Sequence, residues 1–120
     1  EGRLGQKVEL LSGGQRQSLA LAMAILVAPR ILLLDEHTAA LDPKTAAAVM
    51  AATVNAVDSA RLTTLMVTHN MQHAIDYGNR LLMMADGRII FEARGAEKRR
   101  LTVEALVARF HLTDDKMLLA

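Results

Sequence analysis

Two neighbouring carboxylates follow an uninterrupted run of apolar residues in the first third of the chain. Asp35 and Glu36 come directly after residues 31–34, which read Ile, Leu, Leu and Leu. One carboxylate of such a pair suits a divalent cation, and its neighbour suits the transfer of a proton. The alternative is a strand that simply stops at an acidic turn, and the apolar run alone does not separate the two interpretations.

A histidine stands at the end of a second apolar run. Residues 62–67 predict another strand, which Thr68, His69 and Asn70 follow. If the two runs are neighbouring strands of one parallel sheet, their carboxyl ends meet at the same rim, where ligands bind in such sheets. We therefore expect Asp35, Glu36 and His69 to lie together.

A third candidate site lies near the start of the chain, where Ser12, Gly13, Gly14 and Gln15 precede a stretch rich in Ala, Leu and Met. Ser12 is a good helix N-cap, and two glycine amides that no side chain shields can join it in binding an anion at the helix start. The alternative is an ordinary capped helix with a flexible entry.

The elements that position these residues follow from local signals. Residues 31–34 show no polar alternation, which predicts a strand buried on both faces of a parallel sheet covered by helices. The first helix ends before Pro29, and Asp42 with Pro43 begins a second amphipathic helix that runs to about Ser59. The fold class predicted is α/β, with helices flanking a parallel sheet.

The C-terminal part of the chain predicts smaller elements. Asn70 caps a short helix over residues 71–77, and Asp86 with Gly87 joins two strands, 81–85 and 88–92, into a β-hairpin. Thr102 caps a last helix. Residues 98–100, which are Lys, Arg and Arg, are expected on a solvated face, and the tail from residue 113 shows no predicted element.

Composition limits the kind of protein without selecting a function. The chain has 120 residues, enough for one domain or one piece of a larger domain, and 52% of them are hydrophobic. Because only two Phe and one Tyr are aromatic, the core must be aliphatic. The net charge of +1 gives no general attraction to nucleic acid, and the absence of Cys excludes disulfides and thiolate metal sites.

Four motifs in order resemble the ABC ATPases (ATP-binding cassette ATPases), which have a P-loop NTPase-like fold. Residues 11–17 resemble the signature motif of that family and residues 31–36 its Walker B strand. Residues 40–42 resemble its D-loop, and residues 68–69 its switch histidine. The later hairpin and last helix are also similar to the C-terminal part of the family's nucleotide-binding domain. His37 stands where most of the family has Pro, and we interpret it as a family variant rather than a catalyst.

The resemblance implies ATP and Mg²⁺ as cofactors and a role for each motif. Asp35 would bind Mg²⁺ through water, Glu36 would act as general base toward the attacking water, and His69 would contact the γ-phosphate. The ATP of a second nucleotide-binding subunit would be covered by Ser12, Gly13, Gly14 and Gln15, with Asp42 at the same dimer seam.

The resemblance also implies partners, a location and a function. The expected partners are a second nucleotide-binding subunit, transmembrane permease subunits and a substrate-binding protein, with no nucleic acid. The expected location is the cytoplasmic face of the inner or plasma membrane. The residues within these motifs resemble those of bacterial importers of the amino-acid type. An ABC ATPase of translation or DNA metabolism, or an inert interaction fragment, remains an alternative.

One departure from the family concerns the phosphate-binding loop. A Walker A loop ends in Gly-Lys followed by Ser or Thr, and no Gly-Lys dipeptide occurs in this chain. The expected domain organisation is therefore that residues 1–120 are the C-terminal part of one nucleotide-binding domain, a partial domain that lacks the Walker A half. The complete domain is expected to hydrolyse ATP, and these residues alone are expected to be inactive.

Overall fold

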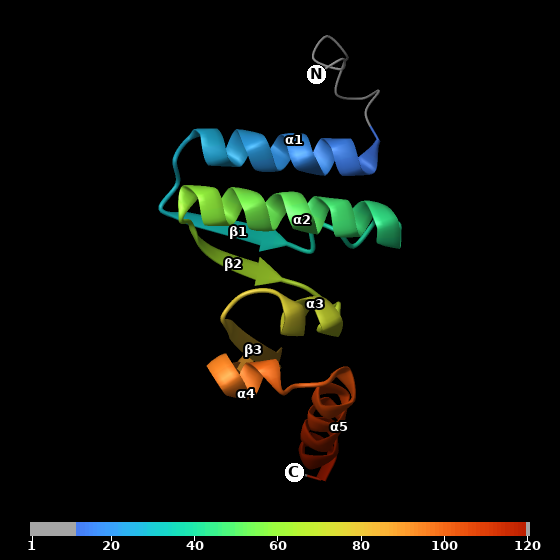
Figure 1. Cartoon of the computed structure of the whole chain (residues 1–120). Helices are drawn as coiled ribbons and strands as arrows, with labels where there is room; N and C mark the ends of the chain where they lie inside the picture. Colours follow the sequence, from blue (N-terminus) through green and yellow to red (C-terminus); the bar gives the residue numbers. More distant parts are fainter. Residues whose placement is uncertain (1–11, 120) are drawn as a thin grey trace. The chain divides into compact units, whose positions relative to one another are not determined.

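The computed structural model describes residues 12–119, with their side chains up to residue 112, so Leu11, the first residue of the signature-like motif, lies outside the described part. The chain forms two compact units, Glu1–His69 and Asn70–Ala120. Figure 1 shows the order of their helices and strands along the chain. Over residues 12–119, no helix is long and apolar enough to cross a membrane.

Over its described residues, 12–69, the first unit has two helices and a two-stranded parallel sheet. In chain order these are α1 (Gly13–Leu26), β1 (Ile31–Asp35), α2 (Pro43–Ala60) and β2 (Thr63–Val67). The strands pair in parallel, with Leu33 opposite Leu65 and Asp35 opposite Val67. Both helices and the parallel pair agree with the elements that the sequence predicts, to within a few residues at their ends.

The helices cover one face of this sheet (Figure 1). Leu32 and Leu34 point into a core with Leu21 of α1, whereas Ile31 and Leu33 are 51% and 66% exposed. The expectation that residues 31–34 are buried on both faces is therefore wrong for the described chain. Side chains alternate across a strand, so helices on a single face can bury only every second residue.

The second unit builds three helices around an antiparallel hairpin. Its elements are α3 (Met71–Asp76), β3 (Arg80–Ala85), β4 (Arg88–Arg94), α4 (Gly95–Arg99) and α5 (Val103–Leu119). The turn uses Asp86 and Gly87, whose φ angles of 49° and 73° suit a two-residue hairpin loop. Its core contains Leu81, Met83 and Leu106, with Phe110 packed against them.

In this second unit two features were not predicted, and one prediction is wrong. The chain forms the short helix α4 and continues α5 to Leu119, where no element was predicted beyond residue 112. Lys98, expected on a solvated face, is only 4% exposed, while Arg99 and Arg100 are exposed as predicted.

Lys98 is buried because it caps the C-terminal end of α3. Its Nζ donates hydrogen bonds to the carbonyl oxygens of Ile75 and Tyr77, the latter at 3.1 Å. A cation there also suits the negative end of the helix dipole. Burial lowers the pKa of the Lys98 amine below its ordinary value, and the charge of Asp76 acts in the opposite direction.

Candidate functional site

The carboxyl ends of β1 and β2 meet at one rim, as the sequence predicts. The strand register places Asp35 opposite Val67, the last residue of β2. The backbone N–H of Glu36 donates to the carbonyl oxygen of Val67 at 2.8 Å, which carries the pairing one residue past the end of β1. Glu36 and the residues after Val67 are therefore neighbours because of the sheet itself.

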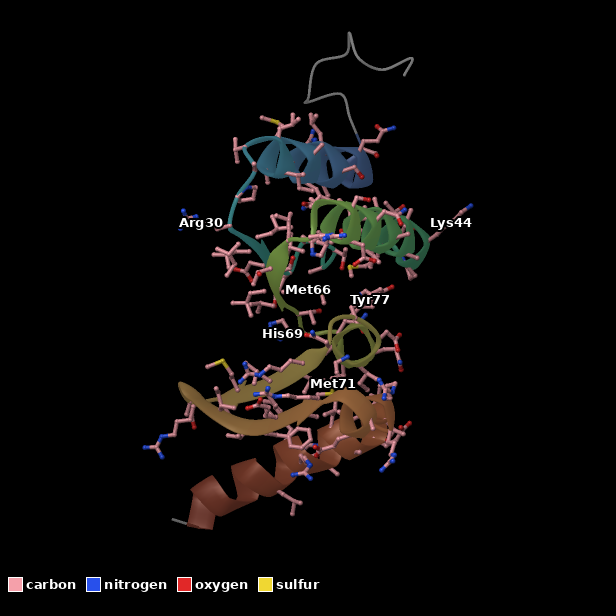
Figure 2. The ribbon with its side chains drawn as sticks, turned by 60° about the vertical axis from the view of Figure 1, so that its left-hand side comes forward. Arg30, Lys44, Met66, His69, Met71 and Tyr77 are labelled. Atoms are coloured by element: carbon pink, nitrogen blue, oxygen red, sulfur yellow. The ribbon has the colours of Figure 1, made fainter. Side chains whose placement is uncertain are left out.

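Glu36 and His69 lie in direct contact at this rim. Nε2 of His69 is 2.5 Å from Oε1 of Glu36, and their side chains are 91% and 33% exposed. Figure 2 shows His69 just beyond the end of β2. A carboxylate paired with an accessible imidazole can accept a proton from a bound molecule or orient a water beside it. The predicted meeting of these two side chains is confirmed.

Asp35 lies at the same end of the sheet, and its side chain is exposed. Among the side chains of residues 12–112, no group of three or more from His, Cys, Asp or Glu could hold a metal ion. Mg²⁺ commonly needs only one or two protein carboxylates, because waters and substrate phosphates complete its coordination. An exposed carboxylate at a strand end fits that mode of binding, and a closed cage of protein ligands is not formed by the described residues.

The start of α1 is a capping box. The Ser12 hydroxyl accepts from the backbone N–H of Gln15 at 3.2 Å, and the Gln15 side chain accepts from the backbone N–H of Ser12 at 3.0 Å. Both side chains thus stabilise the helix start. This pair lies at the first turn of α1, and the first-turn amides of a helix are donors suited to an anion.

The two glycines of this helix start differ in their surroundings. Gly13 is exposed as predicted, whereas Gly14 is buried, so the expectation that neither is shielded is wrong for Gly14. A Cβ at Gly14 would lie 2.3 Å from Cγ2 of Thr45, and one at Gly13 would lie 2.9 Å from Cδ2 of Leu41. Gly14 therefore allows α1 to approach α2 closely.

Asp42 caps the start of α2, where the same helix pair meets. Its Oδ2 accepts from the backbone N–H of Thr45 at 3.2 Å. Hydrogen bonds from the side chain and the backbone amide of Thr45 hold the pKa of Asp42 below its ordinary value. Because Gly13 and Gly14 approach Leu41 and Thr45, the two capped helix starts lie side by side.

Sequence reasoning missed the residues that support this site from α2. Thr45 and Thr53 follow the periodicity of the helix's core-facing side, and that pattern does not distinguish a packing threonine from one that anchors another segment. Nε2 of His37 lies 3.1 Å from Oγ1 of Thr53, and Thr53 is 4% exposed. A threonine among the apolar positions of a helix could have indicated such a contact, because a buried hydroxyl group needs a hydrogen-bond partner.

Comparisons with known proteins identify the family of the chain. The family model for ABC transporters matches residues 1–39. The tyrosine transport ATP-binding protein of Clostridioides difficile is 53% identical over 104 residues, which are 87% of this chain and 41% of that protein. The chain belongs to the ABC transporter family of ATP-binding proteins.

Other members of the ABC transporter family give the same result. A methionine import ATP-binding protein of Streptococcus pneumoniae is 44% identical over 82 residues, covering 68% of this chain and 23% of that protein. A solved ATP-binding cassette of an ABC transporter superposes with a TM-score of 0.71 at 25% identity, covering 88% of this chain and 42% of that one. A nucleotide-free cassette gives a TM-score of 0.66 at 26% identity, covering 78% and 36%.

The α/β fold class is confirmed by these superpositions, and the chain is a partial ABC domain. It spans less than half the length of the curated relatives and solved cassettes that it matches.

Proposed function

We propose that this chain is the C-terminal part of a nucleotide-binding domain, and that the complete protein hydrolyses ATP to drive solute import. The contact between Glu36 and His69, 2.5 Å apart at the rim of two parallel strands, carries the proposal. The identity of 53% to a tyrosine transport ATP-binding protein supports it. The Walker A loop, which is absent from this sequence, belongs to the other part of the domain.

In the proposed reaction, a water attacks the γ-phosphorus of ATP and ADP leaves. Glu36 accepts a proton from that water, and His69 contacts the γ-phosphate and keeps the attacking geometry. Asp35 would hold Mg²⁺ through water, and the ion would supply charge neutralisation on the phosphates. Phosphoryl transfer depends on positioning and on charge stabilisation more than on covalent help. These side chains would orient the water and the γ-phosphate at this rim, and the phosphate-binding loop of the other part of the domain would supply the rest of the site.

The two capped helix starts serve a second nucleotide-binding subunit. Ser12, Gly13, Gly14 and Gln15 cover the partner's ATP with the first turn of α1, and Asp42 lies at the same seam. The side-by-side arrangement of the α1 and α2 starts supports this assignment, since one partner surface can reach both.

The proposed partners are therefore a second nucleotide-binding subunit, permease subunits in the membrane and a substrate-binding protein. The proposed cellular location is the cytoplasmic face of the membrane. Relatives named for tyrosine and methionine match at 53% and 44% identity, which favours an importer of the amino-acid type. A relative named for phosphonates matches at 37% and makes that solute class the second candidate.

The substitution Glu36→Gln in the complete domain tests the reaction. We expect ATP binding to be retained and hydrolysis to fall by about 10²–10⁴-fold, the usual contribution of general acid–base catalysis. The measurement is steady-state phosphate release together with nucleotide affinity. Hydrolysis near the wild-type rate in this variant would remove Glu36 from the role of general base.

The substitution Ser12→Arg tests the shared site. In the Glu36→Gln background ATP should drive dimerisation, and Ser12→Arg should block it because its side chain crowds the anion site at the start of α1. Ser12→Thr is the matched control, because threonine keeps a capping hydroxyl. Gly14 is unsuitable for this test because a side chain there also meets Thr45. An unchanged ATP-dependent dimer with Ser12→Arg in light scattering would contradict the shared site.

A further inference from the structure

Glu36 has a backbone conformation that side-chain-bearing residues rarely adopt. Its φ angle is 49°, in the left-handed region. A non-glycine residue held there is strained and persists only where its surroundings enforce that conformation. Two backbone hydrogen bonds contribute: its N–H donates to Val67 at 2.8 Å, and its carbonyl oxygen accepts from Ala39 at 3.0 Å. Both bind the backbone of Glu36, and neither holds the residue that follows it.

The next residue, His37, is held by its side chain. Its Nε2 lies 3.1 Å from Oγ1 of Thr53 on α2, and Oγ1 of Thr53 donates to the carbonyl oxygen of Val49 at 2.7 Å. Because the hydroxyl proton of Thr53 is directed to Val49, its oxygen must accept, and Nε2 of His37 must donate. The two hydrogen bonds therefore point the same way, from His37 in the turn after β1 to Thr53 and from Thr53 to the backbone of α2.

This contact lies on a rigid part of the first unit. Thr53 is 4% exposed, and its neighbours on the same face of α2, Val49 and Met50, are 2% and 1% exposed. A side chain anchored to that face has a fixed reference point. His37 is joined to Glu36 by one peptide bond, so holding its ring also restricts the backbone rotation that aims the Glu36 carboxylate.

We propose that His37 and Thr53 form a latch that keeps Glu36 in its left-handed conformation and so positions its carboxylate for ATP hydrolysis. The latch rests on the proposed function, in which Glu36 is the general base. His37 is a positioning residue and not a catalytic residue. Nε2 of His37 is hydrogen-bonded to Thr53 of α2. The side chain of His69, in contrast, is 91% exposed and contacts Glu36 directly.

Four substitutions in the complete domain test the latch. His37→Ala removes the donor, and Thr53→Val removes the acceptor while nearly keeping the shape of the side chain. Thr53→Ser keeps the hydroxyl, and Asn55→Ala changes an exposed residue of the same helix. We expect the first two to lower kcat by about ten- to a hundredfold, the effect of a misplaced catalytic group, with KM for ATP unchanged. Thr53→Ser and Asn55→Ala should keep the wild-type kcat.

The Glu36→Gln background separates positioning from general loss of structure. If the latch acts only through the Glu36 carboxylate, adding His37→Ala or Thr53→Val to Glu36→Gln changes the residual rate by less than about twofold, because groups that act as a unit are not additive. If either substitution lowers the rate in the Glu36→Gln background by the same factor as in the wild-type background, its role is structural and the latch is overturned. A Thr53→Ser variant as slow as Thr53→Val would overturn it too.

The same set of variants distinguishes the two hypotheses. A Glu36→Gln domain that hydrolyses ATP at the wild-type rate contradicts the proposed role of Glu36. A slow Glu36→Gln domain together with a wild-type rate in both His37→Ala and Thr53→Val leaves that role intact and overturns the latch alone. Thermal unfolding of each variant identifies any that fail to fold, in which case Thr53→Val, the nearly isosteric change, decides the outcome.

Discussion

Asp42 stabilises the start of α2 through its ionised carboxylate, so this contribution depends on pH. Hydrogen bonds from Thr45 lower the pKa of Asp42 in the folded chain. A lowered pKa means that the unfolded chain binds the proton more readily, and the stabilisation is complete above the unfolded pKa near 3.8. It is then lost as the pH falls through the lower folded pKa.

The substitution Asp42→Asn tests this dependence. Asparagine is also a good N-cap but does not titrate in this range, so we expect a small change in unfolding temperature near pH 7. Between about pH 5 and pH 2 the wild-type domain should lose more stability than the variant. Thermal unfolding across that range is the measurement. Identical slopes with pH in the two proteins would show that Asp42 makes no ionised contribution.

Lys98 shows how one residue can change its role through its surroundings. In the sequence it opens a run of three basic residues, and such runs usually face solvent. The structure instead directs its ammonium group to the carbonyl oxygens of Ile75 and Tyr77 at the end of α3. A buried ammonium group is tolerated when hydrogen bonds replace its lost water, and helix ends offer carbonyl oxygens for this purpose.

The close approach of α1 and α2 depends on Gly14. We expect Gly14→Ala to lower the free energy of unfolding of the complete domain by about 1–3 kcal/mol, because the added methyl group overpacks the interface. It would lie 2.3 Å from Cγ2 of Thr45, an atom that serine lacks. Adding Thr45→Ser should therefore recover most of the loss, which chemical denaturation can measure.

The neighbouring glycine supplies the control for this test. A methyl group at Gly13 would meet only the end of the flexible Leu41 side chain, at 2.9 Å, which can move aside. Gly13→Ala should consequently cost less than Gly14→Ala. If Thr45→Ser restores nothing, the helices do not pack through this contact and Gly14 has another reason to be glycine.

The first unit as a whole leaves one sheet face apolar and exposed. Ile31, Leu33, Leu65 and Val67 are 51%, 66%, 50% and 49% exposed, and the register places Leu33 beside Leu65. Exposed apolar surface of this kind favours association with other chains. This face and the missing phosphate-binding loop both bear on how the 120 residues behave alone.

At this scale we expect the isolated chain neither to bind nor to hydrolyse ATP appreciably, and to aggregate or pack loosely. Most nucleotide affinity comes from backbone amides and a lysine around the β- and γ-phosphates, and no such loop occurs in this sequence. The carboxylates of Asp35 and Glu36 would repel a triphosphate without Mg²⁺. Isothermal titration of Mg-ATP into a monodisperse sample is the measurement. Micromolar affinity would mean that the described rim binds phosphate by itself.

The sequence by itself determined the features that depend on neighbouring residues. The helix caps at Ser12, Asp42 and Asn70 and the hairpin turn at Asp86 and Gly87 are all present in the structure. Each rests on hydrogen bonds or backbone angles within a few residues, so local residue types suffice to predict it. The meeting of Glu36 and His69 was also predictable, because parallel strands bring their carboxyl ends to one rim.

Only the tertiary structure decided which surfaces meet. Four features depend on contacts between segments that are distant in sequence. They are the one-sided burial of residues 31–34, the close approach of Gly14 to Thr45, the hydrogen bond between His37 and Thr53, and the burial of Lys98. A residue type sets what a side chain can do, whereas its partner is set by how helices and strands pack. These contacts therefore depend on the packing of α2 against α1 and of α4 against α3, and on the hydrogen bond that joins the turn after β1 to α2.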